Sequence, residues 1–473
     1  MAQIINIKSS QVFTPQKYVI SMLDEINYTN NLFNKKILEN SCGNGSFLKE
    51  IVKRYIVDCM NNKIEKEKII YGISRDIVAF EIDESKILEC KNALNILVSQ
   101  YGLEGIEWNI INDDFLKHNV LEEFDYIVGN PPYIDYRGLD SDTRVFLKEK
   151  FKSCNFGKFD YFYPFIEKSL NHLKDDGYMA YVIPNSLFKN ISAKGIREII
   201  KPYIYKIIEN FGENVFERVN VSPSIIYLKK EISQEFEYND LVEKRTNLIK
   251  KGSLIDKWIF NYDNNEVLKF SDYYEVGSSI ATLYNKAYIF TTDNVDDDFY
   301  YVGEYKIEKE IVRKTMSPRS CTLNKKEFII FPYGFLNGKI KRYSDKEFET
   351  LFPQAANYLR QFKTNLDNSS KDVSAKWFEY GRSQAINAMF NKKLMMSIII
   401  TNEVKIYELD ENEIPYSGIY IIQKEEGWSL EYAKNLLEST HFFDYVKKIG
   451  VISSKKSRRI TPNDVKKYKF KGN

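Results

Sequence analysis

Apolar runs of strand length alternate with amphipathic stretches through the first half of the chain. Short apolar runs predict strands at 36–40, 77–82, 108–111, 126–128, 178–183, 203–210 and 224–228. Apolar residues at helical spacing predict helices at 47–60, 159–173 and 193–201. A further helix is expected after the strand at 77–82, through about residue 98. Thr14-Pro15 has the residue types of an N-cap and a first helical position, so a further helix is expected over 15–27. Strands that alternate with helices predict an α/β fold with a mostly parallel sheet.

The pattern changes near residue 235, where segments become shorter, more polar and richer in Tyr, Asn and Lys. The spacing of strand–helix–strand units is lost, and the segment Glu231–Arg245 is charged without a clear period. Helices are expected around 346–365 and 428–447, among irregular strands. We predict two domains, an α/β domain over 1–235 and a mixed α+β domain over 236–473, which also agrees with the length of 473 residues.

Composition narrows the class of protein. With 43% hydrophobic and 28% charged residues, the chain falls in the range of soluble globular proteins. No apolar stretch approaches the ~20 residues of a membrane span, and the start lacks a signal-peptide pattern, so we expect neither membrane insertion nor export. Five cysteines without a CxxC pair and only three histidines predict no metal site and fit a reducing cytoplasm.

The net charge of +2 conceals an uneven distribution. Residues 1–235 carry 30 basic and 33 acidic side chains, a net of −3, whereas residues 236–473 carry 38 and 33, a net of +5. The last 23 residues alone hold eight Lys and Arg against one Asp. Such a run is most often a solvated surface, and the alternative is contact with phosphates.

Polar side chains follow the predicted strands at their carboxyl ends, where open α/β sheets bind ligands. The first turn, Leu38–Leu48, has glycines that let the backbone approach a ligand, and Glu39 within it suits a cationic group. Glu81 ends the second strand and can accept bonds from the two hydroxyls of a ribose. Asp114 and Phe115 end the third strand and suit an adenine amino group and ring. The order matches the parts of S-adenosylmethionine.

The fourth strand ends in Asn130-Pro131-Pro132-Tyr133. The Asn side chain and the carbonyl of the next Pro can both accept hydrogen bonds from one planar NH2 group. Two consecutive prolines stiffen the corner and remove N–H donors, and the Tyr ring offers a face for stacking. This corner is suited to hold an exocyclic amine or an amide nitrogen while that nitrogen reacts.

The ordered set of segments resembles the gamma class of amino-methyltransferases, and its layout is most similar to TaqI-like DNA adenine-N6 methyltransferases of restriction–modification type. Val12–Pro15 resembles their N-terminal cofactor motif, Lys158–Phe165 the helix start whose last Phe lies against the cofactor adenine, and Phe211–Phe216 the segment whose Phe stacks on the target base. The resemblance covers nearly the whole first half. It implies a Rossmann-like, class I S-adenosylmethionine-dependent sheet followed by a target-recognition domain.

The resemblance also implies the site residues. Asn130, Pro131 and Tyr133 would be catalytic, and Phe216 with Tyr133 would stack on the flipped base; because this segment holds one residue more than the family pattern, Phe211 is a substitute for Phe216. The cofactor, S-adenosylmethionine, would contact Thr14, Pro15, Glu39, Ser41, Gly43, Gly45, Glu81, Ile82, Asp114, Phe115, Asn130, Pro132 and Phe165. Direct transfer needs no metal and no covalent intermediate.

The second half would read double-stranded DNA. Val276–Thr282 and Trp377–Gln384 resemble segments of target-recognition domains, although the latter also suits interdomain packing. Arg and Gln side chains pair with guanine and adenine edges, and Lys and Arg pair with phosphates. The expected DNA-binding residues are Lys314, Arg319, Lys341, Arg342, Arg382, Gln384, Lys455, Lys456, Arg458 and Arg459.

Three alternatives stay open at this point. A protein-glutamine methyltransferase or an RNA adenine-N6 methyltransferase would use the same corner, and a non-catalytic DNA-recognition subunit would retain the fold. About ten residues precede the first cofactor motif, and the one nuclease-like string, Asp76 followed by Glu84-Ser85-Lys86, lies inside the cofactor region. We therefore expect any restriction endonuclease partner to be a separate chain.

Overall fold

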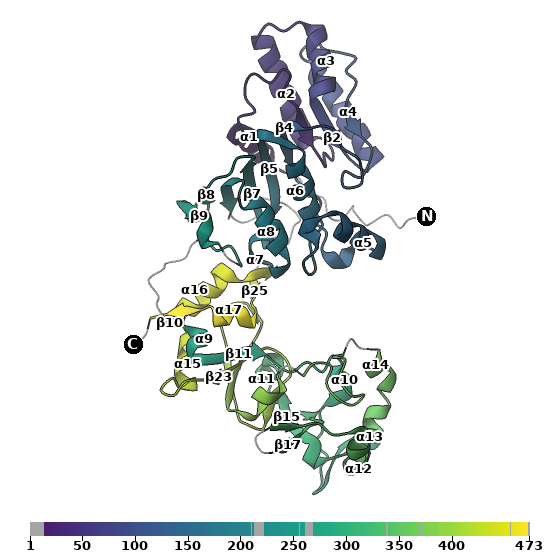
Figure 1. Ribbon diagram of the computed structural model, residues 1–473, viewed down its shortest axis with the longest axis vertical. Helices are drawn as coiled ribbons and strands as arrows, with labels where there is room; N and C mark the ends of the chain where they lie inside the picture. The colour runs from purple at the N-terminus through teal and green to yellow at the C-terminus, as the bar shows by residue number, and fades with distance from the viewer. Residues whose placement is uncertain are drawn as a thin grey trace. The chain divides into compact units, whose positions relative to one another are not determined.

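The computed structural model describes residues 14–209, 211, 222–254, 256–260, 268–336, 339–368, 371–383, 385–454 and 456–471. The chain divides into two compact units, Met1–Tyr262 and Asp263–Asn473, and each is described by itself. Figure 1 shows the helices and strands of both. Within the described ranges, no helix is long and apolar enough to cross a membrane.

Unit 1 is built on a nine-stranded sheet with the order β3-β2-β1-β4-β5-β7-β6-β8-β9. Its strands are β1 (Ile37–Glu39), β2 (Ile77–Phe80), β3 (Ile110–Ile111), β4 (Phe124–Gly129), β5 (Leu173–Pro184), β6 (Ile204–Glu209), β7 (Pro223–Lys229), β8 (Glu235–Asp240) and β9 (Arg245–Lys250). Strands β1 to β5 are mutually parallel, and β7 pairs antiparallel with both β5 and β6. The chain order reverses between β1 and β4, which is where a ligand crevice is expected at the carboxyl ends of the strands.

Helices cover both faces of this sheet (Figure 1). They are α1 (Gln16–Glu25), α2 (Ser46–Asn61), α3 (Lys66–Asp76), α4 (Glu84–Ser99), α5 (Ser141–Lys150), α6 (Phe162–Asn171), α7 (Ser186–Lys189) and α8 (Lys194–Ile200). Along β5, Met179 and Tyr181 belong to one core with α6 and α8, whereas Ala180 and Val182 belong to the other core with α1, α2 and α4. Side chains of a strand point alternately to opposite faces, so a strand buried on both sides reads as a continuous apolar run.

The predicted α/β alternation of the first half is confirmed, with three differences. Helices α3 and α5 were not predicted, and the third strand is shorter than expected. The third difference is the domain boundary, which lies at Tyr262 rather than near residue 235, because β8 and β9 extend the first sheet. Trp258 also stacks on Phe188 with ring centroids 6.0 Å apart, which joins the segment after β9 to unit 1.

Unit 2 is a mixed α+β unit, as predicted for the second half. Two four-stranded sheets, β11-β23-β19-β21 and β12-β16-β15-β22, are accompanied by smaller sheets and hairpins. The strands are β10 (Leu268–Lys269), β11 (Tyr274–Ser278), β12 (Ile289–Phe290), β13 (Phe299–Val302), β14 (Tyr305–Glu308), β15 (Val312–Met316), β16 (Glu327–Ile330), β17 (Gly334–Leu336), β18 (Lys339–Lys341), β19 (Lys393–Met396), β20 (Ile399–Ile400), β21 (Ile406–Leu409), β22 (Glu413–Pro415), β23 (Ile419–Gln423), β24 (Val451–Ser454), β25 (Ser457–Arg459) and β26 (Lys469–Phe470).

The helices of unit 2 are shorter than expected. They are α9 (Phe270–Tyr273), α10 (Asn285–Tyr288), α11 (Pro318–Thr322), α12 (Asp345–Leu351), α13 (Pro353–Arg360), α14 (Lys363–Asp367), α15 (Leu430–Glu438), α16 (Thr440–Ile449) and α17 (Pro462–Lys466). The helix expected over 346–365 is three helices, because Pro353 cannot continue a helix and instead begins α13. The helix expected over 428–447 breaks at Ser439, whose hydroxyl caps α16 by accepting from the amide of Phe442.

Candidate cofactor and substrate site

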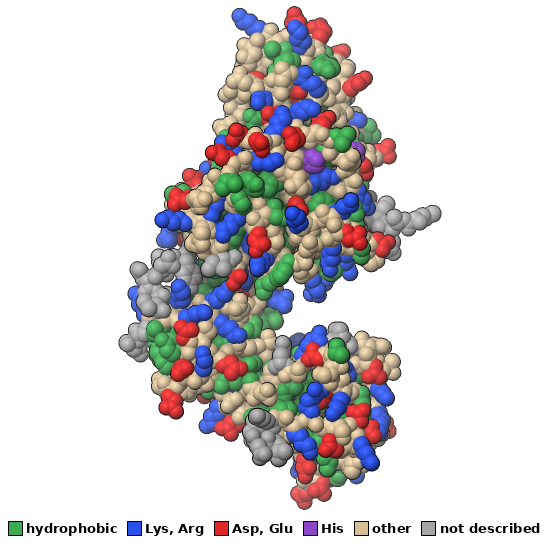
Figure 2. Space-filling model, in the orientation of Figure 1, with side chains coloured by type: hydrophobic (Ala, Val, Ile, Leu, Met, Phe, Trp, Pro, Cys, Tyr) green, Lys and Arg blue, Asp and Glu red, His purple; other side chains and the backbone are tan. Residues whose placement is uncertain are grey.

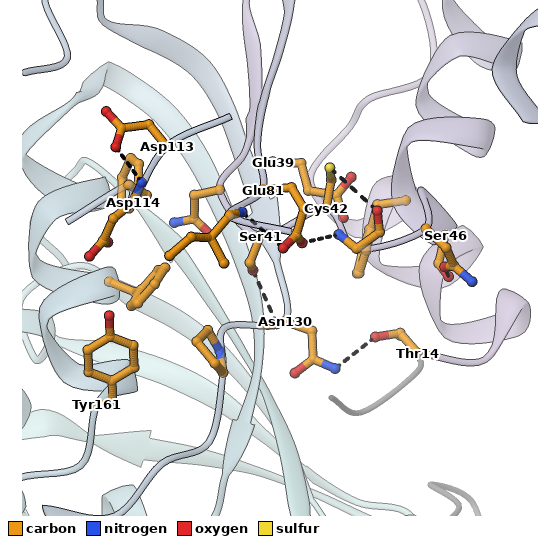
Figure 3. A pocket seen from close by; sticks show the side chains of 18 residues that line it. Thr14, Glu39, Ser41, Cys42, Ser46, Glu81, Asp113, Asp114, Asn130 and Tyr161 are labelled. Atoms are coloured by element: carbon orange, nitrogen blue, oxygen red, sulfur yellow. Dashed lines mark hydrogen bonds between the residues drawn. The ribbon is translucent and has the colours of Figure 1, made fainter. Parts of the chain in front are cut away.

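One pocket lies at the carboxyl ends of β1, β2 and β4, at the point where the strand order reverses (Figure 3). It is lined by Thr14, Glu39, Asn40, Ser41, Cys42, Gly43, Asn44, Ser46, Phe47, Glu81, Ile82, Asp113, Asp114, Phe115, Asn130, Pro132, Tyr161 and Phe165. The ends of parallel strands bring residues that are far apart in sequence to one edge of the sheet. Each strand end therefore contributes a separate wall of the pocket.

The turn after β1 is held by a carboxylate from the neighbouring strand end. Glu81 accepts hydrogen bonds from the amide of Gly43 at 2.9 Å and from the amides of Ile82 and Asp83 at 2.9 and 3.0 Å. Gly43 has a φ of +55°, a conformation that glycine adopts without steric cost. Gly45 does not line the pocket, but a Cβ on it would lie 2.5 Å from Cys90 Sγ, so packing also requires glycine there.

Glu39 is the buried acid of the pocket, with an exposed fraction of 2%. Its Oε2 atom has no hydrogen-bond partner among the described residues. Burial raises the pKa of Glu39 well above its ordinary value, and the nearby Cys90 and Glu81 act in the same direction. A buried carboxylate oxygen without a partner is costly, so its presence at a pocket points to a cationic ligand group that would pair with it.

An aromatic wall closes the side of the pocket formed by the turn after β3. The ring of Phe115 lies 5.3 Å from that of Phe80 and 5.7 Å from that of Phe165, which belongs to α6. Tyr161 packs edge-to-face on Phe165 at 5.5 Å. Asp114 accepts from the amide of Leu116, and burial raises the pKa of its carboxyl. An apolar wall with a carboxylate at its rim suits a flat heterocycle that carries an amino group.

The Asn-Pro-Pro-Tyr corner lies on the other side of the pocket. Nδ2 of Asn130 donates to Thr14 Oγ1 at 3.2 Å, and the backbone carbonyl of Asn130 accepts from Ser41 Oγ at 3.2 Å. Figure 3 shows the Asn130 and Thr14 side chains turned toward each other. The first contact fixes which end of the Asn130 amide faces Thr14, and the second ties the corner to the turn after β1.

Thr14 differs from its predicted local role. Its residue type and the following proline predicted an N-cap for α1, but no side chain caps that helix. The Thr14 hydroxyl instead contacts Asn130, 116 residues away in sequence. Pro15 does not line the pocket. Thr14 therefore links the start of the described chain to the Asn-Pro-Pro-Tyr corner.

The predicted base-stacking residues have different outcomes. Tyr133 packs edge-to-face on Phe162, with centroids 6.1 Å apart, and burial raises the pKa of its hydroxyl. Neither Tyr133 nor Pro131 lines the pocket itself. Phe211 packs edge-to-face on Tyr18 at 5.0 Å. Phe216 lies outside the described residues, as do Val12 and Phe13 of the N-terminal motif.

Most of the predicted cofactor residues meet at this one pocket; Pro15 and Gly45 are the two that do not line it. The sequence did not indicate Asn40, Cys42, Asn44, Ser46, Phe47, Asp113 and Tyr161, which also line it. Asn40 has a recognisable local signal, since it directly follows Glu39 at the end of β1. Its Nδ2 donates to Ser169 Oγ at 2.9 Å and to the hydroxyl of Tyr181, which fixes its amide beneath the pocket.

The residues present fit S-adenosylmethionine as a ligand. The Glu39 oxygen without a partner suits the ammonium group, the Glu81 carboxylate in the pocket lining is an acceptor that suits ribose hydroxyls, and the Phe115–Phe165 wall suits adenine. In the described part of the chain, no group of three or more His, Cys, Asp or Glu residues is arranged to hold a metal ion.

Unit 2 brings together the two segments that resembled target-recognition domains. Ala281 and Arg382 form an antiparallel bridge, and the amide of Gly381 donates to the carbonyl of Thr282. Phe378 stacks on Phe348 with centroids 3.9 Å apart, and Phe378 and Tyr380 belong to the core of unit 2, with Trp377 packed against it. The alternative of interdomain packing is not needed to explain its aromatic residues.

Several of the predicted DNA-binding side chains make ion pairs within unit 2. Arg342 pairs with the buried Glu379, and Arg382 pairs with Asp372 at 3.0 Å. Lys341 Nζ lies 3.6 Å from Glu347. On the face drawn in Figure 2, basic and acidic side chains are interspersed. These cations are already neutralised within the unit.

The other predicted DNA-binding residues are less engaged. Lys314, Arg319, Lys456 and Arg459 are exposed and form no ion pair with a described residue. Arg458 is partly buried, and its Nε has no partner among the described residues. Gln384 and Lys455 lie outside the described residues. The DNA contacts therefore stay predictions.

Comparisons with known proteins agree with this picture. Residues 46–216 match the family model of the Eco57I restriction-modification methylase. The chain is 24% identical over 510 aligned positions to the type II restriction enzyme and methyltransferase RM.Eco57I of Escherichia coli, covering 87% of this chain and 51% of that protein. It is 23% identical to the type II methyltransferase M.AccI of Acinetobacter calcoaceticus, covering 81% of this chain and 67% of that protein. The chain thus spans about half the length of the first of these relatives.

Solved structures share the fold. The type IIL restriction-modification enzyme MmeI in complex with DNA superimposes with a TM-score of 0.56 at 14% identity, covering 95% of this chain and 65% of that one. The DrdV–DNA complex gives a TM-score of 0.53 at 12% identity, covering 92% of this chain and 52% of that one. Together with the strand order, these findings confirm the predicted Rossmann-like class I fold and the resemblance to restriction–modification methyltransferases.

Proposed function

We propose that this chain, a gamma-class methyltransferase of restriction–modification type by its resemblance, transfers a methyl group to N6 of a flipped-out adenine in double-stranded DNA. The observation that carries the proposal is the Asn130–Pro131 corner, held by Thr14 and Ser41 beside a pocket that suits S-adenosylmethionine. The name of the matched family and the names of the relatives support a DNA methyltransferase of a restriction–modification system.

Different residues of the pocket would contact different parts of the cofactor. Glu39 would pair with its ammonium group, Glu81 would accept from the ribose hydroxyls, and Asp114 would accept from the adenine amino group. Phe115 and Phe165 would flank the adenine ring from one side. When bound there, S-adenosylmethionine supplies the methyl group as an electrophile, so the chain has only to position and activate the amine.

Asn130 and Pro131 activate that amine. Adenine N6 is a poor nucleophile because its lone pair is delocalised into the ring. Hydrogen bonds from the two N6–H groups to the Asn130 side-chain oxygen and the Pro131 carbonyl would localise the lone pair and stabilise the positive charge that develops on nitrogen. Holding the amine at near-attack distance supplies the rest of the rate enhancement. The proton is lost afterwards, because the product ammonium is acidic.

A base within a duplex cannot reach this corner, so the adenine must leave the stack. Tyr133 is the last residue of the Asn-Pro-Pro-Tyr corner and is our candidate for stacking on the flipped base, together with Phe216. Unit 2 would position the duplex through Lys314, Arg319, Lys456 and Arg459, which are exposed and not engaged in ion pairs with described residues. A cytoplasmic location and a restriction endonuclease as partner complete the proposal.

The proposal is tested by expressing the chain in a bacterial host without adenine methylases and reading its DNA by methylation-sensitive sequencing. We expect one sequence motif methylated at N6 of adenine, and no methylation with Asn130→Ala. Thr14→Ser serves as a matched control, because it alters the same corner but keeps the hydroxyl. If the purified chain binds S-adenosylmethionine and leaves DNA unmodified, the DNA assignment fails, and RNA adenines and protein amides become the substrates to test.

A further inference from the structure

Lys168 is a buried cation beside the cofactor pocket that the mechanism above does not use. It belongs to α6, is 8% exposed, and makes no ion pair with a described residue. Burial lowers the pKa of its ammonium to about 8, against the opposing effect of Asp114 and Asp113. A lysine held in an apolar core without a counter-ion costs stability that a methionine of similar size would avoid. Packing alone therefore does not explain why a lysine occupies this position.

The Lys168 ammonium is bound by the backbone of the turn that carries Asp114 and Phe115. Nζ donates to the carbonyls of Phe115 and His118 at 2.5 Å each, and lies 3.4 Å from the carbonyl of Leu116. It also lies 4.8 Å from the centroid of the Phe115 ring. One side chain thus fixes both the main chain and the ring of the residue that forms the adenine wall.

Phe165, which belongs to the same aromatic wall as Phe115, precedes Lys168 by three residues on the same helix. Residues three apart lie on one face of a helix, so α6 presents a pocket-lining ring and a tether for the facing turn side by side. The position of the Phe115 ring against Phe165, with centroids 5.7 Å apart, and with it the wall for a flat ring, depends on this tether.

We propose that Lys168 is a positioning residue for the adenine of the cofactor, acting through the turn that carries Asp114 and Phe115. The inference rests on the proposed binding of S-adenosylmethionine, and it assigns Lys168 to the adenine half of that site and not to the methionine half. The chain offers a matched control in Lys251, which is also buried and donates to the carbonyl of Pro202 at 2.7 Å and to Ser233 Oγ at 2.8 Å, away from the pocket.

The test measures binding of S-adenosylhomocysteine and of adenosine by titration calorimetry, with thermal unfolding as a check on folding. Lys168→Met should lower the affinity for both ligands by about tenfold, which is the effect of losing one hydrogen-bonded charged group from a wall of the site. Lys251→Met should bind both ligands with affinities within about twofold of the parent. Lys251 does not touch the pocket, and substitutions at distant sites act independently. Glu39→Gln should weaken S-adenosylhomocysteine but not adenosine, which has no ammonium group.

Each outcome supports or contradicts the positioning role of Lys168. If Lys168→Met resembles Lys251→Met, the inference is wrong while the proposed function stands. If it weakens S-adenosylhomocysteine but not adenosine, Lys168 acts on the methionine half and the inference is again wrong. If the parent chain binds neither ligand, the proposed function fails and takes the inference with it. Lys168→Gln, which keeps two N–H donors, replaces Lys168→Met if that variant does not fold; loss of folding in both would assign Lys168 to the core alone.

Discussion

At the scale of a single residue, the hydroxyl of Thr14 orients the side-chain amide of Asn130. An amide has a carbonyl end and an NH2 end, and only the carbonyl end of Asn130 can accept a hydrogen bond from a substrate amine. Because Nδ2 donates to Thr14 Oγ1 at 3.2 Å, the oxygen is turned to the other side. Thr14 was predicted as a cofactor contact, and its position in the pocket agrees with that role as well.

Thr14→Val tests this orientation, because valine keeps the shape of the side chain and removes the acceptor. We expect the single-turnover rate of methyl transfer to fall about tenfold, the equivalent of one hydrogen bond in the transition state, with cofactor affinity nearly unchanged. Thr14→Ser should retain the parent rate. A normal rate with weakened cofactor binding would show instead that Thr14 contacts only the cofactor.

At the scale of secondary-structure elements, α13 of unit 2 begins on a carboxylate supplied from elsewhere. Glu308, the last residue of β14, accepts from the amides of Gln354 at 2.7 Å and Ala355 at 2.8 Å. These amides have no partner within the helix, and a negative charge also complements the positive end of the helix dipole. The sequence holds no sign of this contact, because the two segments are more than forty residues apart.

Glu308→Ala should lower the free energy of unfolding of unit 2 by about 1–2 kcal/mol, as the loss of an N-cap does. Glu308→Gln, which keeps one acceptor oxygen, should lose about half as much. Glu304→Ala removes the same charge from an exposed position in the turn between β13 and β14, and it should leave stability unchanged. Chemical denaturation followed by tryptophan fluorescence would measure all three; equal effects of the two alanine variants would contradict the cap.

Among the secondary-structure elements, some strands and site residues could be predicted from the sequence and others could not. Strands buried on both faces were predictable because they read as continuous apolar runs, and the site residues at their ends followed from the parallel topology. The strand β8 was missed because it is fully buried on one face only, so charged and polar residues alternate with apolar ones along Glu235–Asp240 and no continuous apolar run appears. The lining role of Tyr161 depends on how α6 and its preceding turn face the sheet, which no local pattern encodes.

At the scale of the whole molecule, the boundary between units at Tyr262 can be tested by truncation. A chain ending at residue 262 retains β8, β9 and the stacking of Trp258 on Phe188, whereas a chain ending at residue 235 loses all three. We expect the longer fragment to unfold cooperatively and bind S-adenosylhomocysteine, and the shorter one to aggregate through the exposed edge of β6. Equal behaviour of both fragments would place the boundary where the sequence suggested it.

The ion pairs of unit 2 have a consequence for how its affinity for DNA would respond to salt. A cation that binds a phosphate releases a counterion from the DNA, so affinity falls with salt concentration in proportion to the number of such contacts. Arg342, Arg382 and Lys341 already have carboxylate partners, and these carboxylates would compete with DNA phosphates for the three cations.

Asp372→Asn removes one such competitor and leaves Arg382 without its carboxylate. We expect tighter binding to nonspecific DNA at low salt and a slope of log affinity against log salt that is steeper by about one unit. Glu403→Gln, which breaks the exposed pair with Lys405, is the control and should leave the slope unchanged. The number of basic side chains without a carboxylate partner, and not the number of basic residues in the sequence, would then set the ionic strength at which this protein dissociates from DNA.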